Sequence, residues 1–181
     1  MSRYLGLDLS MSSTGWACWS TDMPKPTLGT WKLADSVEHS GRACIRLQKN
    51  LHALYQLGGF DHVAVEDTLP ADKLKGHTTV DTIKLTVGLL MHARSFCDAM
   101  GINFYEVNQK TWRKHFIGTQ PRETKTADWK RLALQRARVL GEDPTAHDAA
   151  EAFGILDYHL HRIRVQTPWT TDDIFRQLVR K

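Results

Sequence analysis

Three short apolar runs near the start of the chain predict strands. Residues 4–9 are apolar except for Asp8 and are followed by a serine-rich turn, which is typical of a buried strand. Residues 16–20 fit the returning strand of a hairpin, and residues 28–33, beyond a turn with two prolines, fit a third strand. The opening of the chain is therefore expected to be an antiparallel meander.

Apolar residues at spacings of three and four then predict two helices, the first ending at the glycine pair 58–59 and the second at Gly101. Their apolar faces would be formed by Cys44, Leu47, Leu51 and Leu54 in the first helix, and by Val80, Ile83, Val87, Leu90 and Ala93 in the second. Each helix is followed by an apolar run, 62–66 and 102–107, that predicts a further strand. A strand that follows a helix in this way favours a parallel pair joined by a right-handed crossover.

The second half of the chain is predicted to be helical. A short helix is expected over 111–116, longer helices over 125–140 and 146–161, and a terminal helical segment from Thr170 or Thr171. The resulting order of elements predicts an α/β domain with a mixed sheet and helices on both of its faces.

Composition agrees with one globular domain over residues 1–181. The chain is 41% hydrophobic and 24% charged, and its longest apolar stretches are far shorter than the roughly 18–20 residues that cross a bilayer. No charged N-terminal region precedes an apolar stretch, so no secretory signal is expected. The three cysteines form no CxxC pattern and are expected to be reduced, buried thiols of a cytoplasmic protein.

The charge of the chain is unevenly distributed. Residues 108–140 hold nine basic side chains against two acidic ones, while the whole chain carries only +4. Such a basic segment suggests a polyanionic partner, although a pair of solvated helices would have the same composition. The candidates for contacts with DNA phosphates are Lys110, Arg113, Lys114, Lys125 and Lys130. Trp112, Phe116 and Trp129 in this segment would either stack on unpaired bases or anchor the core.

Four acids stand out because apolar sequence surrounds them. Asp8 and Glu66 lie at the ends of predicted strands, and Asp148 and Glu151 lie three residues apart, on one face of the last long helix. Carboxylates in such surroundings are costly to bury unless they are paired or bind a metal. If the four converge at one edge of the sheet, their oxygens would suit Mg²⁺ or Mn²⁺, and two such ions could hydrolyse a phosphodiester.

Each acid also has a simpler interpretation. Asp148 and Glu151 are favoured near a helix start by the helix dipole, Asp8 could form a turn, and Glu66 could pair with a lysine. His147, beside the acids, could move a proton or bind a metal, or could be a capping or surface histidine. Their occurrence together at strand ends and a helix start favours the metal site.

The motifs resemble those of the RuvC family of Holliday junction resolvases, within the RNase H-like nuclease superfamily. They are residues 5–10 (LGLDLS) with 14–16 (TGW), 63–67 (VAVED) and 148–153 (DAAEAF), in the family's order, and the resemblance extends from Tyr4 to about His161. It implies a five-stranded mixed sheet whose first three strands are antiparallel. It also implies that the metal-binding catalytic residues are Asp8, Glu66, Asp148 and Glu151.

The same resemblance implies a function in DNA recombination and repair. Family members are homodimeric crossover junction endodeoxyribonucleases that use Mg²⁺, nick two strands of a four-way junction symmetrically and leave 5′-phosphate ends. A cytoplasmic protein, associated with the nucleoid of a bacterium or of a phage-infected cell, is therefore expected.

Two departures from the family pattern bear on specificity. The last acid is Glu151, where aspartate is usual, and Leu69 is the candidate for the junction wedge, where the family tends to have an aromatic residue. A broader branched-DNA nuclease, as some phage relatives are, would fit these departures.

Three other functions compete with junction resolution. The first is an RNase H-like nuclease acting on an RNA/DNA hybrid or structured RNA. The second is a non-catalytic protein that binds branched DNA, although an idle acidic cluster would repel phosphate. The third is an actin-like kinase or ATPase, whose first phosphate loop resembles residues 7–10, but that architecture needs two domains around a cleft.

Overall fold

Five strands form one mixed sheet in the order β3-β2-β1-β4-β5. The computed structural model describes residues 1–36, 39–67 and 79–169. Its strands are β1 (Arg3–Asp8), β2 (Thr14–Ser20), β3 (Thr27–Trp31), β4 (His62–Glu66) and β5 (Asn103–Val107). The first three strands pair antiparallel, whereas β4 pairs parallel to β1 and β5 parallel to β4. This is the five-stranded mixed sheet that the sequence predicts.

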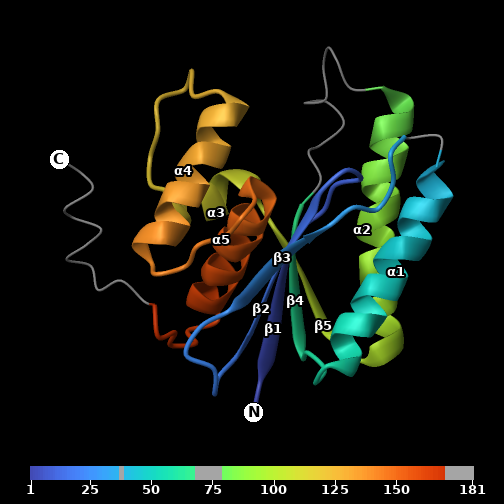
Figure 1. Cartoon of the computed structure of the whole chain (residues 1–181), viewed down its shortest axis with the longest axis horizontal. Coiled ribbons are helices and arrows are strands. Elements are labelled where there is room, and N and C mark those ends of the chain that lie inside the picture. Colours follow the sequence, from blue (N-terminus) through green and yellow to red (C-terminus); the bar gives the residue numbers. More distant parts are fainter. Residues whose placement is uncertain (37–38, 68–78, 170–181) are drawn as a thin grey trace.

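Helices cover both faces of the sheet. They are α1 (Ser40–Gln56), α2 (Val80–Met100), α3 (Gln109–Phe116), α4 (Thr126–Val139) and α5 (His147–Arg162). Figure 1 shows α1 and α2 packed together on one side of the sheet, with α3, α4 and α5 on the other side. None of the helices in the described part of the chain is long and apolar enough to cross a membrane.

Side chains alternate between the two faces of the sheet along each strand, so one part of the core lies under α1 and α2 and the other under α3, α4 and α5. On β1, Leu5 and Leu7 point toward α1 and α2, and Val63 and Val65 do the same on β4. The intervening residues face α5, where Ala64 packs with the apolar residues of that helix. Because side chains alternate with a period of two, Asp8 and Glu66 belong to the α5 face.

Two glycines allow α5 to lie directly on the sheet. A Cβ atom at Gly6 would lie 2.5 Å from the carbonyl oxygen of Ala152, and one at Gly15 would lie 1.9 Å from that of Asp148. No side chain would fit at either distance. Since Gly15 pairs with Asp8 across the hairpin, this contact holds the start of α5 at the end of β1.

The predicted elements match the structure to within a few residues. The first turn of α3 differs, because the helix begins at Gln109 and the side chain of Asn108 caps it by accepting from the backbone N–H of Lys110. All three cysteines are buried and unpaired within the described residues, as expected. The predicted terminal helix from Thr170 or Thr171 and the wedge candidate Leu69 lie outside the described residues.

One buried histidine has no evident role in the fold. His159 of α5 is 1% exposed, and its ring lies 4.4 Å from that of Tyr105 and 6.0 Å from that of His62. Within the described residues, neither ring nitrogen of His159 has a hydrogen-bond partner. Burial lowers the pKa of His159 from 6.5 to about 4, with the charges of His62 and Arg162 acting in the same direction.

We therefore expect His159 to make the protein sensitive to acid. In the unfolded chain His159 is protonated below pH 6.5, whereas in the folded chain it is protonated only below about pH 4. The free energy of unfolding therefore decreases as the pH is lowered from 6.5 to 4. The loss is about 1.4 kcal/mol per pH unit at most, or about 2 kcal/mol by pH 5. His159→Leu should remove this loss, which urea denaturation at pH 7.5 and pH 5 measures. Equal pH dependence in the variant and the wild type would contradict the prediction.

Candidate active site

The parallel pairing of β1 and β4 places two of the predicted acids side by side. Leu7 pairs with Val65, so Asp8 and Glu66 follow at corresponding positions where the two strands end. Both side chains belong to the face that α5 covers.

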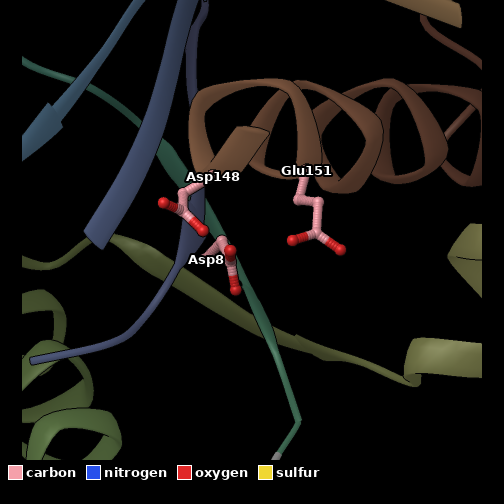
Figure 2. Close-up of side chains that lie close together, drawn as sticks. All are labelled: Asp8, Asp148 and Glu151. Carbon is pink, nitrogen blue, oxygen red and sulfur yellow. The ribbon is translucent and has the colours of Figure 1, made fainter. Parts of the chain in front are cut away.

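The start of α5 brings two more acids to the same place. Asp148 and Glu151 project from the first turns of the helix, and in Figure 2 their carboxylates point toward that of Asp8. An oxygen from each of the three carboxylates lies within 4.8 Å of the others. Glu151 is only 3% exposed, and the other two are half-buried. We call Asp8, Asp148 and Glu151 the acidic cluster.

Glu66 lies beside the acidic cluster but is held by α3. The side chain of Gln109 donates to its Oε1 at 2.6 Å, and the indole N–H of Trp112 donates to its Oε2 at 2.7 Å. Burial raises the pKa of Glu66, while the hydrogen bond from Trp112 and the charge of Arg113 oppose that rise. Its negative charge is near enough to raise the pKa of Asp8.

Like charges confined in a half-buried space give the acidic cluster its electrostatic character. Burial raises the pKa of Asp8 well above its usual value, and the charges of Glu151, Glu66 and Asp148 raise it further. Burial also raises the pKa of Glu151, against the charges of Arg113 and Lys130. A divalent cation would relieve this repulsion, and carboxylate oxygens are the ligands that Mg²⁺ and Mn²⁺ prefer. The residues present therefore fit such an ion.

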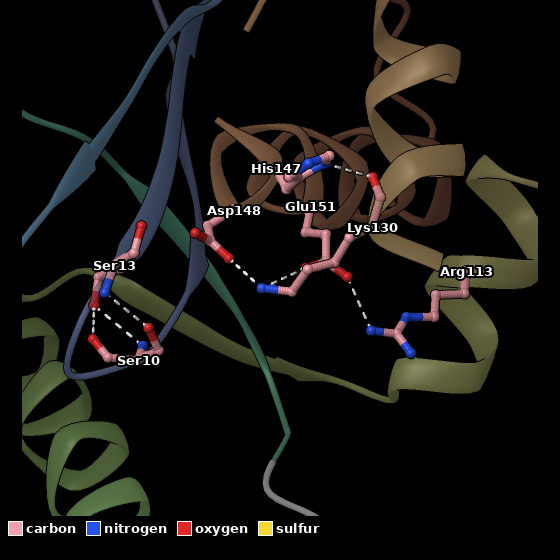
Figure 3. A network of polar contacts seen from close by, with 8 residues as sticks. Ser10, Ser13, Arg113, Lys130, His147, Asp148 and Glu151 are labelled. Carbon is pink, nitrogen blue, oxygen red and sulfur yellow. Dashed lines mark hydrogen bonds and ion pairs between the residues drawn. The ribbon is translucent and has the colours of Figure 1, made fainter. Parts of the chain in front are cut away.

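Two of the predicted DNA-binding residues, Lys130 and Arg113, contact these acids. Lys130 Nζ lies 2.6 Å from Asp148 Oδ1 and 3.9 Å from Glu151 Oε2, and Arg113 Nη2 lies 2.9 Å from Glu151 Oε1 (Figure 3). Burial raises the pKa of Asp148, but hydrogen bonds from Lys130 and Ser13 and the charge of Lys130 outweigh it, so the pKa is lowered. The positive charges of Lys130 and Arg113 thus partly compensate the negative charge of the acidic cluster.

The other basic candidates remain at the surface. Lys110, Lys114 and Lys125 are exposed, on α3 and at the start of α4. Of the aromatic residues interleaved with them, Trp112 and Phe116 are buried in the core, so the core interpretation is correct for these two.

The exposed His147 is directed toward α4. Its Nδ1 lies 3.2 Å from the backbone carbonyl oxygen of Lys130, as Figure 3 shows. Its charge contributes to lowering the pKa of Asp148, and the geometry favours a surface residue over a metal ligand.

Gln109 and Trp112, which orient Glu66, are not among the site residues that the sequence predicts. The sequence indicates only base stacking or a core position for Trp112. The spacing of three residues between Gln109 and Trp112 on a short helix places both side chains on one face, which is the pattern that could have indicated a shared partner.

Comparisons with known proteins support the fold. No family model matches the sequence, and no curated protein matches it. Thermus thermophilus RuvC in complex with a Holliday junction superposes with a TM-score of 0.66 at 13% identity, over 91% of this chain and 98% of that one. The yeast mitochondrial Holliday junction resolvase Ydc2 gives 0.55 at 14% identity, over 99% of this chain and 85% of that one.

A third solved structure, the fowlpox virus resolvase with its Holliday junction DNA, gives a TM-score of 0.53 at 8% identity, over 89% of this chain and 98% of that one. The chain therefore has the RNase H-like fold of the RuvC-type resolvases, as its motifs suggested.

Proposed function

We propose that residues 1–181 form a single nuclease domain that resolves four-way or branched DNA by metal-dependent hydrolysis of phosphodiester bonds. The observation that carries the proposal is the convergence of Asp8, Asp148 and Glu151 at the end of β1, in a fold shared with Holliday junction resolvases. Two of those neighbours are complexes with junction DNA, which favours branched DNA as the substrate.

The acidic cluster would hold the divalent cation, and Glu66 would complete the set from β4. Each oxygen of Glu66 accepts one hydrogen bond from α3 and retains a second lone pair for a ligand. When bound, Mg²⁺ or Mn²⁺ supplies Lewis acidity for the attacking water and the leaving oxygen.

The basic residues would act in two ways. Arg113 is 13% exposed and pairs with Glu151, where its charge favours the ionised form of that carboxylate and its hydrogen bond orients it. Lys130 is 38% exposed and pairs with Asp148, so its ammonium would lie where it can also contact the phosphate of a bound DNA strand. Lys110, Lys114 and Lys125 would hold the DNA backbone, an interaction that weakens as salt increases.

A side-by-side digestion tests the proposal. In Mg²⁺ the protein is expected to cleave a synthetic four-way junction at least about tenfold faster than a linear duplex or an RNA/DNA hybrid of the same sequence, because specific recognition adds to phosphate binding. Preference for the hybrid would indicate an RNase H-like activity instead. Junction binding without cleavage in either Mg²⁺ or Mn²⁺ would indicate a non-catalytic DNA-binding protein.

Symmetric cleavage would need two copies of the chain, and we propose that α1 and α2 form the interface between them. Ile45 of α1 and Val87 and Met91 of α2 are about half exposed, although they are large and apolar. Ile45 also lines a groove of about 670 Å³ between the two helices. Sedimentation velocity should then give a particle of twice the 20.6 kDa chain mass, and a monomer at micromolar concentration would contradict the dimer.

A further inference from the structure

Trp112 contacts both Glu66 and α5, the helix that supplies Asp148 and Glu151. Its side chain is fully buried on α3, and α5 presents a glycine opposite the ring. A Cβ atom at that glycine, Gly154, would lie 2.9 Å from Cζ3 of the indole. The close packing fixes the ring against α5, the helix that supplies two of the acids.

The edge of the indole orients Glu66. Its Nε1–H donates to Glu66 Oε2 at 2.7 Å, while Gln109, one turn earlier in α3, donates to Oε1 at 2.6 Å. Both oxygens of Glu66 are thus tied to one rigid helix, which sets the direction of the carboxylate.

The face of the same indole supports Arg113. The guanidinium carbon lies 5.3 Å from the ring centroid of Trp112 and 5.5 Å from that of Trp129, distances at which a cation is attracted to an aromatic face. From this position Nη2 donates to Glu151 Oε1 at 2.9 Å. The two indoles therefore fix the group that orients Glu151.

We infer that Trp112 is a positioning residue of the site: its N–H orients Glu66, and its ring face, through Arg113, orients Glu151. The inference rests on the proposed metal-dependent function. The two acids lie on different elements, Glu66 on β4 and Glu151 on α5. Their relative placement decides how well the site binds Mg²⁺, a small ion with strict octahedral geometry. Trp112 should therefore govern metal affinity without touching the metal.

Trp112→Phe removes the N–H that orients Glu66 and keeps an aromatic ring at this position of α3. We expect the Kd for Mn²⁺, measured by electron paramagnetic resonance without DNA, to rise about tenfold. Trp169→Phe is the matched control. It removes an indole N–H that donates to Asp157 at 2.8 Å within the same core, and should leave the Kd for Mn²⁺ within about twofold of the wild type.

The outcomes distinguish this inference from the proposed function. A wild-type protein that binds no Mn²⁺ would overturn the metal site and the inference together. A wild type that binds Mn²⁺, with Trp112→Phe and Trp169→Phe equal in Kd, would overturn the inference alone. Should Trp112→Phe fail to fold, Gln109→Leu removes the other hydrogen bond to Glu66 from a half-buried position. It should raise the Kd about threefold. An unchanged Kd would show that the hydrogen bonds from α3 to Glu66 do not set the metal affinity, which would overturn the inference.

Discussion

Replacing Asp8 with asparagine is expected to lower the rate of junction cleavage by roughly 1,000-fold or more, because it removes the carboxylate that β1 contributes to the acidic cluster. The amide is nearly isosteric, so the fold and the basic surface remain. Junction affinity in EDTA should stay within about threefold of the wild type, since we propose that it comes from phosphate contacts of exposed basic residues outside the acidic cluster. Single-turnover cleavage and an electrophoretic shift assay measure the two quantities.

Asp128→Asn is the matched control for this variant. It removes the same charge from the exposed first turn of α4, two residues from Lys130, where Asp128 pairs with Arg131 at 3.5 Å. Its cleavage rate should stay close to that of the wild type. If Asp8→Asn cleaves as fast as Asp128→Asn, Asp8 is not part of the catalytic site.

Adding Mg²⁺ is expected to stabilise the protein strongly, and EDTA to reverse the effect. An ion at 100 times its Kd adds about 2.7 kcal/mol to the free energy of unfolding. For a domain of this size that raises the Tm by roughly 5–10 °C. The shift should be larger at pH 8 than at pH 6, because burial raises the pKa of Asp8 and of Glu151 and protons then compete with the ion. Thermal denaturation followed by circular dichroism measures it.

In the metal-free protein, Asp8 and Glu151 lower the stability as the pH rises, which is opposite to the contribution of His159. A carboxyl whose pKa is raised by folding stabilises the folded state at low pH, and this stability is lost as the pH rises through the folded pKa. Metal-free Asp8→Asn should therefore gain Tm relative to the wild type as pH increases, and should show little response to Mg²⁺. Equal Tm for the wild type with Mg²⁺ and with EDTA at pH 8 would argue against a metal site.

The placement of Asp8 beside Glu66 could be predicted from sequence because few arrangements are possible. Each acid ends an apolar strand, the helix that precedes β4 favours a parallel pair, and the alternation of side chains then selects the face. The spacing of Asp148 and Glu151 selects one face of α5 in the same way. Local periodicity and chain connectivity were sufficient for these positions.

The partners of the acids could not be predicted in this way. Whether Lys130 reaches Asp148 or solvent depends on how α4 packs against α5, and no local pattern encodes that packing. The same holds for Trp112, since a tryptophan at a helical spacing fits a core position whether or not its N–H has a carboxylate partner. The hydrogen bonds that hold Glu66 come from Gln109 and Trp112 of α3, which are 43 and 46 positions away from it in sequence.

The most direct test of the metal site is anomalous diffraction from crystals soaked in Mn²⁺. We predict a peak with oxygens of Asp8, Asp148 and Glu151 at about 2.0–2.2 Å, and its absence from crystals of Asp8→Asn. Wild-type crystals that bind Mn²⁺ elsewhere and show no peak between these three carboxylates would contradict the account.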